Sequence, residues 1–318
     1  MTTNLEWRTA TKKRPCYICG KPDWCSRNRS GDVAICRRPK GSSKTTKIDS
    51  SGAEYSVHRK EGTKTTGNYT HNKKPEYKSP RKAEDWILNL VYRNFLDGLA
   101  LDGRALTQMH QRGLMPDDIN AGLYKYLPEF LKKNNYNITL LLQKLENIFG
   151  IETLLQVPGF YLNTNKRISL TTHDQILIPV RNQHNQIISL KCRLPYDSET
   201  GIPKYTYFTS SKHNGPSSGA YVHFPVFGKW NKSHQNLIIT EGELKADLAS
   251  IYFDDPCISI PGVSSWRRSI PEIDRIKPEK VVIAFDMDKS TNPNVDFHHN
   301  NFCQELQDRS IKFGVLEW

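Results

Sequence analysis

Two groups of acidic residues, each placed directly after an apolar segment, constrain this chain more than any other feature. Glu241 follows the apolar segment 237–240, and Asp286 and Asp288 follow the segment 281–285. Acids at the carboxyl ends of neighbouring parallel strands meet at one edge of the sheet, where ligands of open α/β sheets bind. Their oxygens are the ligands that a hard cation such as Mg²⁺ prefers. The pattern predicts an α/β fold with a phosphoryl-transfer site formed by these three carboxylates.

The surrounding segments alternate between strand-like and helix-like patterns. In order we expect strand 237–240, helix 243–253, strand 257–260, helix 266–275, strand 280–285, helix 296–308 and strand 311–316. Such alternation predicts a parallel sheet with helical crossovers. Gly242 would let the backbone turn closely at the end of the first strand, with the N-terminus of a helix beside it. We expect His298 and His299 on the solvent side of their helix.

The region before this sheet, residues 83–232, is predicted to be a mixed α+β subdomain. Apolar residues recur at helical spacing in 86–92 and 138–145, so its first part should be mainly helical. A β-hairpin is expected later, because segments 176–181 and 187–193 flank a polar turn.

The second strand of this hairpin carries two cations. Side chains alternate along a strand, so Lys191 and Arg193 are expected on the same face. A solvated basic face without a ligand is the alternative interpretation.

Four of the seven cysteines cluster near the N-terminus. Cys16, Cys19, Cys25 and Cys36 have the spacing C-x2-C-x5-C-x10-C, and Gly20 favours a tight turn after the first pair. This arrangement predicts a structural Zn²⁺ site with four thiolate ligands. Disulfides are the alternative, but we expect a reducing environment for this protein.

Positive charge is concentrated in the N-terminal quarter. Residues 1–82 carry 20 Lys and Arg against 7 Asp and Glu, whereas the remainder carries 25 against 26. A basic segment of this kind is typical of proteins that bind a polyanion, and a solubilising tail is the alternative. Residues 41–82 are poor in large aliphatic side chains, so we expect a basic flexible linker after a zinc-binding module at 1–40.

The sequence favours a cytoplasmic protein that acts away from membranes. No apolar run approaches the roughly 20 residues of a membrane-spanning helix, and residues 1–8 lack the apolar stretch of a signal peptide. The chain contains no G-x4-G-K-[ST] sequence, so it encodes no P-loop motor, and a partner would have to unwind a duplex.

The motifs together resemble a known family. Glu241-Gly242 with Asp286-Met287-Asp288 resembles the Toprim fold, which bacterial DNA primases, topoisomerases and certain nucleases share. Three further segments resemble, in order, the helical and basic motifs ahead of Toprim in DnaG-type primases: 112–119, 176–193 and Pro203-Lys204-Tyr205. Segments 157–161 and 291–293 look like a plasmid- and phage-associated group of Toprim proteins.

This resemblance implies a Toprim domain at 233–318, preceded by the basic α+β subdomain and a small N-terminal zinc ribbon. The implied activity is a primase-like nucleotidyltransferase that makes short RNA primers for a plasmid, phage or mobile element. Its implied partners are single-stranded DNA, nucleoside triphosphates and a separate replicative helicase.

The resemblance also implies a role for each residue of the site. Glu241 would be the acid nearest the reacting phosphate, and Asp286 and Asp288 would hold Mg²⁺ or Mn²⁺. The cations that would contact the template backbone or the triphosphate are Lys191, Arg193 and Lys204.

Two other functions are compatible with the same motifs. In a Toprim nuclease, water would replace the 3′-hydroxyl as the attacking group. A nucleic-acid-binding protein without catalysis would account for Lys245, which stands where bacterial primases usually have an acid.

Overall fold

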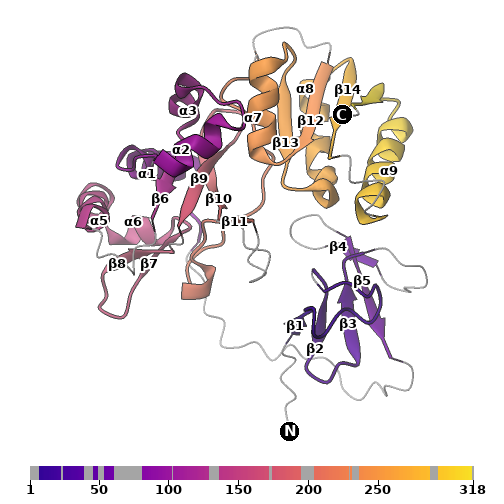
Figure 1. Cartoon of the computed structure of the whole chain (residues 1–318), viewed down its shortest axis with the longest axis horizontal. Coiled ribbons are helices and arrows are strands. Elements are labelled where there is room, and N and C mark those ends of the chain that lie inside the picture. Colours follow the sequence, from indigo (N-terminus) through magenta and orange to yellow (C-terminus); the bar gives the residue numbers. More distant parts are fainter. Residues whose placement is uncertain are drawn as a thin grey trace. The chain divides into compact units, whose positions relative to one another are not determined.

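The computed structural model describes most of the chain (Figure 1). The described residues are 7–22, 24–38, 46–48, 54–60, 81–101, 103–128, 136–171, 174–194, 204–228, 230, 236–286 and 293–316. The chain divides into two compact units, Met1–Lys73 with Gly262–Trp318, and Lys74–Pro261. Among the helices in these described parts, none has both the length and the apolar character needed to cross a bilayer.

The N-terminal segment forms an antiparallel sheet of short strands in the order β1-β2-β3-β5-β4. The bounds are β1 (Trp7–Thr9), β2 (Ser26–Asn28), β3 (Val33–Cys36), β4 (Thr46–Ile48) and β5 (Glu54–Arg59). Strand β5 lies where we expected a linker, and it pairs with β3 from Cys36↔Ser56 to Val33↔Arg59. The ordered module therefore extends past residue 40. Composition concealed this strand because its stability comes from pairing with β3 more than from aliphatic side chains.

The unit Lys74–Pro261 contains the predicted hairpin. Strands β9 (Gln175–Arg181) and β10 (Ile187–Arg193) pair antiparallel. They are the central strands of a sheet with the order β11-β10-β9-β6, whose edge strands are β6 (Lys125–Leu127) and β11 (Tyr205–Tyr207). The hairpin prediction is confirmed.

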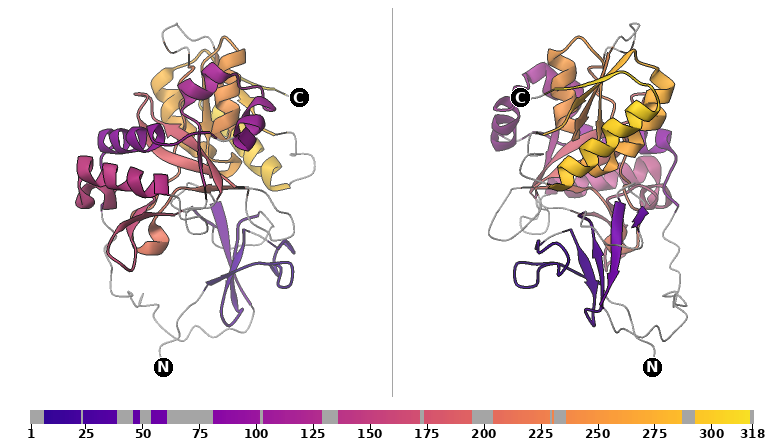
Figure 2. Two further views of the ribbon diagram at one scale, coloured as in Figure 1. Left: turned by 60° about the vertical axis from the view of Figure 1, so that its left-hand side comes forward. Right: turned by 90° about the vertical axis from the view of Figure 1, so that its right-hand side faces the viewer.

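The expected helical region is also present. It contains α1 (Asp85–Asp97), α2 (Gly103–His110), α3 (Pro116–Gly122), α5 (Tyr136–Phe149) and α6 (Ile151–Leu155). Helices α1 and α5 pack side by side (Figure 2). A small hairpin of β7 (Phe160–Leu162) and β8 (Ile168–Leu170) follows them.

Both faces of the β9–β10 hairpin are buried. One face packs on the core that α1 and α5 contribute to, through Leu177, Leu190 and Cys192. The opposite face, with Ile176 and Ile178, packs in a second core with residues of α2, α3 and α7 (Glu243–Tyr252). A side chain on either face of this hairpin therefore meets protein.

The C-terminal part has the predicted strand and helix order. It runs through β12 (Asn236–Glu241), α7 (Glu243–Tyr252), β13 (Cys257–Ile260), the 3₁₀ turn η2 (Val263–Ser269), α8 (Ile270–Ile276), β14 (Lys280–Ala284), α9 (Pro293–Asp308) and β15 (Phe313–Val315). Strand β12 is parallel to β13, and β14 is parallel to β15. The strand order is β13-β12-β14-β15 (Figure 1). The mixed α/β fold with a parallel sheet is thus confirmed.

The two histidines of α9 are buried, so the prediction that they face solvent is wrong. His298 and His299 belong to the inward face of this helix, at the spacing set by Val295, Phe302 and Leu306. The His299 ring packs edge-on against a phenyl ring of the core, that of Phe285. The two imidazoles occupy inward positions of α9 that apolar side chains usually fill.

Candidate functional site

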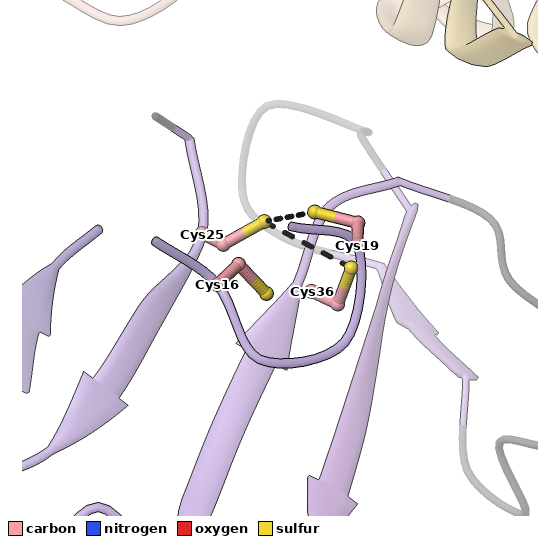
Figure 3. A group of neighbouring side chains, drawn as sticks. All are labelled: Cys16, Cys19, Cys25 and Cys36. Carbon is pink, nitrogen blue, oxygen red and sulfur yellow. Dashed lines mark hydrogen bonds between the residues drawn. The ribbon is translucent and has the colours of Figure 1, made fainter. Parts of the chain in front are cut away.

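The four N-terminal cysteines form one compact cluster (Figure 3). Cys16 and Cys19 lie on a turn that Gly20 closes with φ +72°, and its N–H donates to the Cys16 carbonyl (2.7 Å). Cys25 directly precedes β2, and Cys36 is the last residue of β3. The side chains point toward one another, and all four sulfur atoms lie within 4.8 Å of one another.

The dimensions of this cluster fit a zinc ion. A tetrahedral site with Zn–S bonds of 2.3 Å places its sulfur atoms roughly 3.8 Å apart. The Cys25 sulfur lies 3.7 Å from that of Cys19 and 3.8 Å from that of Cys36. All four thiols are free of disulfides. The geometry therefore matches a closed structural metal site and argues against the disulfide alternative.

The cluster favours a thiolate even without a cation. The hydrogen bond between the sulfur atoms of Cys25 and Cys36 lowers the pKa of Cys25 to about 5 and raises the pKa of Cys36. Sharing one proton between neighbouring sulfurs is expected where several thiols are crowded together, and a divalent cation would replace that proton.

The predicted carboxylates occupy the ends of two strands. Glu241 is the last residue of β12, and Gly242 then turns into α7 with a positive φ of +86°. Asp286 is the second residue after β14. Both carboxylates are half-buried. Asp288 lies outside the described residues, so the three-carboxylate site stays a prediction.

Lys191 lies inside the protein and pairs with a carboxylate. Its ammonium is 3.1 Å from Glu243 Oε2 and 3.2 Å from Oε1. Burial by itself would lower the pKa of Lys191, but the charges of Glu243 and Tyr207 and the hydrogen bonds to them together outweigh burial and raise this pKa. The cation is therefore held in its charged form by a residue at the start of α7.

Arg193 and Lys204 lie around one tyrosine ring. The Arg193 guanidinium donates to the Tyr205 hydroxyl (3.0 Å) and to Gln108 Oε1 (3.3 Å). Lys204 is exposed, and its ammonium lies 6.0 Å from the centre of the Tyr205 ring. Register pairs Lys191 with Ile178 and Arg193 with Ile176, which confirms that both cations share one face of β10.

A second buried polar group was not predicted. Asp247 of α7 accepts hydrogen bonds from the hydroxyl of Tyr124 and from His223 Nε2 (3.1 Å). The backbone N–H of Arg181 donates to His223 Nδ1 (3.0 Å), so the imidazole proton resides on Nε2. Burial, followed by the Asp247 charge, raises the pKa of Tyr124. All these side chains are shielded from solvent, so we assign the group to positioning α7 rather than to catalysis.

The sequence contained one signal for this group. Asp247 falls at a position on α7 where helical spacing points inward, and a buried acid needs a donor. The sequence does not reveal which residue donates to Asp247, because Tyr124 stands 123 positions earlier in the chain.

Comparison of sequences identifies one family for part of the chain. Residues 227–318 match a family described as a domain of unknown function, DUF3854. No curated protein matches the sequence.

Comparison of structures identifies DnaG primase catalytic cores as similar folds. The RNA polymerase domain of Mycobacterium tuberculosis primase DnaG has a TM-score of 0.52 at 11% identity, with 74% of this chain and 76% of that chain covered. The same domain solved with double-stranded DNA has a TM-score of 0.52 at 12% identity, covering 65% and 66%.

A structure of Aquifex aeolicus primase, with its zinc-binding and RNA polymerase domains, matches at a TM-score of 0.47 and 14% identity. The match covers 64% of this chain and about half, 49%, of the Aquifex chain. The two matches with a TM-score of 0.52 show that the fold is similar to that of a primase RNA polymerase domain.

Proposed function

We propose that this protein is a primase-like nucleotidyltransferase that joins ribonucleotides into short primers on single-stranded DNA. The observation that carries the proposal is the turn Glu241-Gly242, which places an acid at the end of β12 inside a fold similar to a primase RNA polymerase domain. The proposed setting is the replication of a plasmid, phage or other mobile element, with a separate helicase as partner.

In this proposal the sheet is of the Toprim type, and its carboxylates hold Mg²⁺ or Mn²⁺. Glu241, Asp286 and Asp288 would supply the oxygen ligands that these ions prefer. The bound cation would neutralise charge on the attacking and leaving oxygens. Glu241 would also accept the proton of the attacking 3′-hydroxyl.

The three cations predicted to contact the template or the triphosphate would take two different roles. Arg193 and Lys204 would contact the phosphates of the template or of the incoming triphosphate. Lys191 would instead hold the start of α7 in place through Glu243, because its charge is already paired inside the protein.

The zinc-binding module would hold single-stranded template. Its cysteine cluster fits a structural zinc ion, and the excess of positive charge in residues 1–82 would favour contact with a polyanion. Zinc content near one ion per chain is the expected result for the purified protein.

Incorporation of labelled nucleoside triphosphates on single-stranded DNA with Mg²⁺ or Mn²⁺ tests this function. The protein should make short primers, and Glu241→Gln and Asp286→Asn should abolish them. Glu279→Gln is the matched control, because it removes an equal charge from an exposed position outside the proposed site.

Each outcome of the assay separates the proposed activity from its alternatives. A shortened template without primers would identify a nuclease, and neither product would favour binding without catalysis. Primer yield unchanged in Glu241→Gln would reject the assigned site.

A further inference from the structure

The cysteine cluster has a cation in contact with it. Nη1 of Arg38 lies 3.9 Å from the Cys19 sulfur and 3.8 Å from the Cys25 sulfur, and it donates a hydrogen bond to each. Guanidinium nitrogens carry only donors and stay protonated at any relevant pH. One positive charge therefore faces two of the four sulfur atoms.

An aromatic ring fixes the position of this cation. The Arg38 guanidinium carbon lies 4.9 Å from the centre of the Trp24 ring, within the range of a cation–π contact. Trp24 itself has φ +58°, in the left-handed region that bulky residues rarely adopt. Trp24 is 54% exposed, so burial does not account for that conformation. In this backbone conformation the Trp24 ring stacks on the Arg38 guanidinium.

The negative charge of the four sulfur atoms makes the contact with Arg38 favourable. Four thiolates around one divalent cation carry a net charge of about −2, which is costly in a partly buried site. A fixed guanidinium offsets part of that charge, and its hydrogen bonds to the metal-bound sulfurs make them weaker nucleophiles. Hydrogen bonds to ligand atoms commonly tune metal sites in this way.

We propose that Arg38, held by Trp24, is a positioning residue of the metal site that strengthens metal binding and shields the sulfurs of Cys19 and Cys25 from electrophiles. This inference rests on the proposed zinc site. It attributes part of the stability of that site to Trp24 and Arg38, which are not themselves metal ligands.

The neighbouring arginine provides a matched control. The Arg37 guanidinium lies over the Tyr55 ring, 5.6 Å from its centre. Arg37→Gln removes the same charge one residue away, whereas Arg38→Gln removes the charge that touches the sulfurs. A general electrostatic effect of the basic module would appear equally in both variants.

The test compares zinc affinity and sulfur reactivity in the full chain. Zinc affinity is measured by competition with a chromogenic chelator, and sulfur reactivity by the rate of alkylation with iodoacetamide. Arg38→Gln should weaken zinc binding by about 10-fold or more and accelerate alkylation of the zinc-loaded protein, while Arg37→Gln should match the original protein. Trp24→Leu should change both quantities in the same direction as Arg38→Gln, by a smaller factor.

A conservative variant covers the case in which Arg38→Gln does not fold. Arg38→Lys keeps the charge but lacks the planar donor group, so it should fall between the original protein and Arg38→Gln. Equal zinc affinities and alkylation rates in the variants of Arg38 and Arg37 would overturn the inference. An original protein that binds no zinc would instead refute the proposed zinc site, which is a separate result.

Discussion

Lys191 of β10 and Glu243 of α7 form an ion pair within the protein, with 3.1 Å between the ammonium nitrogen and the nearer carboxylate oxygen. Only 7% of Lys191 and 3% of Glu243 is exposed. Glu243 lies two residues after Glu241, so the pair ties the turn that carries Glu241 to the central hairpin. The ion pair thereby anchors the first residue of α7, which directly follows the turn.

Removal of one partner should therefore cost far more than removal of both. Lys191→Met should destabilise the protein by about 3 kcal/mol or more, because the Glu243 charge would remain buried without its partner. The double variant Lys191→Met with Glu243→Leu should recover most of that loss. Urea denaturation of the single and double variants measures the effect. Additive losses would contradict a direct interaction between the two side chains.

Arg193 and Lys204 should determine how strongly single-stranded DNA binding depends on salt. Replacing a residue that contacts phosphate should weaken binding and reduce the slope of log K against log [salt] by about 1. We expect this for Arg193→Gln and Lys204→Gln in fluorescence anisotropy titrations. Lys144→Gln on the exposed side of α5 is the control, because it removes the same charge from another element. Slopes equal to that of the control would exclude the two residues from the interface.

Most of the fold was predictable because its elements have strong local patterns. Strands β9, β10, β12 and β13 are mostly apolar segments, and pattern alone placed them. The cysteine cluster was also predictable, because close spacing constrains a short segment strongly. Strand β5 was missed, since its side chains are mostly polar and pairing with β3 is a non-local effect.

Contacts within the site were not predictable from the sequence for a similar reason. Lys191 read as a surface cation because nothing near it in the chain indicates that the β10 face is covered by α7. Its partner Glu243 stands 52 positions away, and Tyr124 stands 123 positions from Asp247. The pairing of buried charges depends on which helices cover which face, and periodicity does not specify that.

Gly242 is needed for the turn between β12 and α7. Its φ of +86° is unfavourable for any residue with a Cβ atom, although no atom lies within 4 Å of the place a Cβ would take. Gly242→Ala should destabilise the protein by about 1 to 2 kcal/mol through backbone strain alone. Gly103→Ala is the control: its surroundings are equally open, and φ there is not positive. It should be neutral or slightly stabilising. Equal unfolding midpoints for the two variants would contradict the strain.

The Tyr124 hydroxyl should contribute to the stability of the α7 attachment. Tyr124→Phe removes one of the two side-chain donors that Asp247 has among the described residues and leaves His223, which should cost about 1 to 3 kcal/mol in a buried site. Tyr126→Phe is the matched control, because its hydroxyl donates to Asp174 (2.9 Å) at an exposed position. Thermal unfolding should separate the two variants by several degrees, with Tyr126→Phe close to the original protein. A Tyr124→Phe protein as stable as the control would show that the Asp247 hydrogen bond is not stabilising.

Metal removal should unfold the N-terminal sheet. Its buried cluster consists of Ala10, Cys16, Cys25 and Cys36, so the thiols themselves take the place of an aliphatic core. Zinc in comparable small sites contributes about 10 kcal/mol or more at neutral pH, which exceeds what so small a core can supply. Chelation, or Cys25→Ser, should therefore release the amide protection of β2 and β3 while β9 and β10 keep theirs in hydrogen exchange. Cys303→Ser on α9 is the control and should leave zinc content and exchange unchanged. Protection of β2 and β3 that survives complete zinc removal would mean that the strands are stabilised by pairing alone.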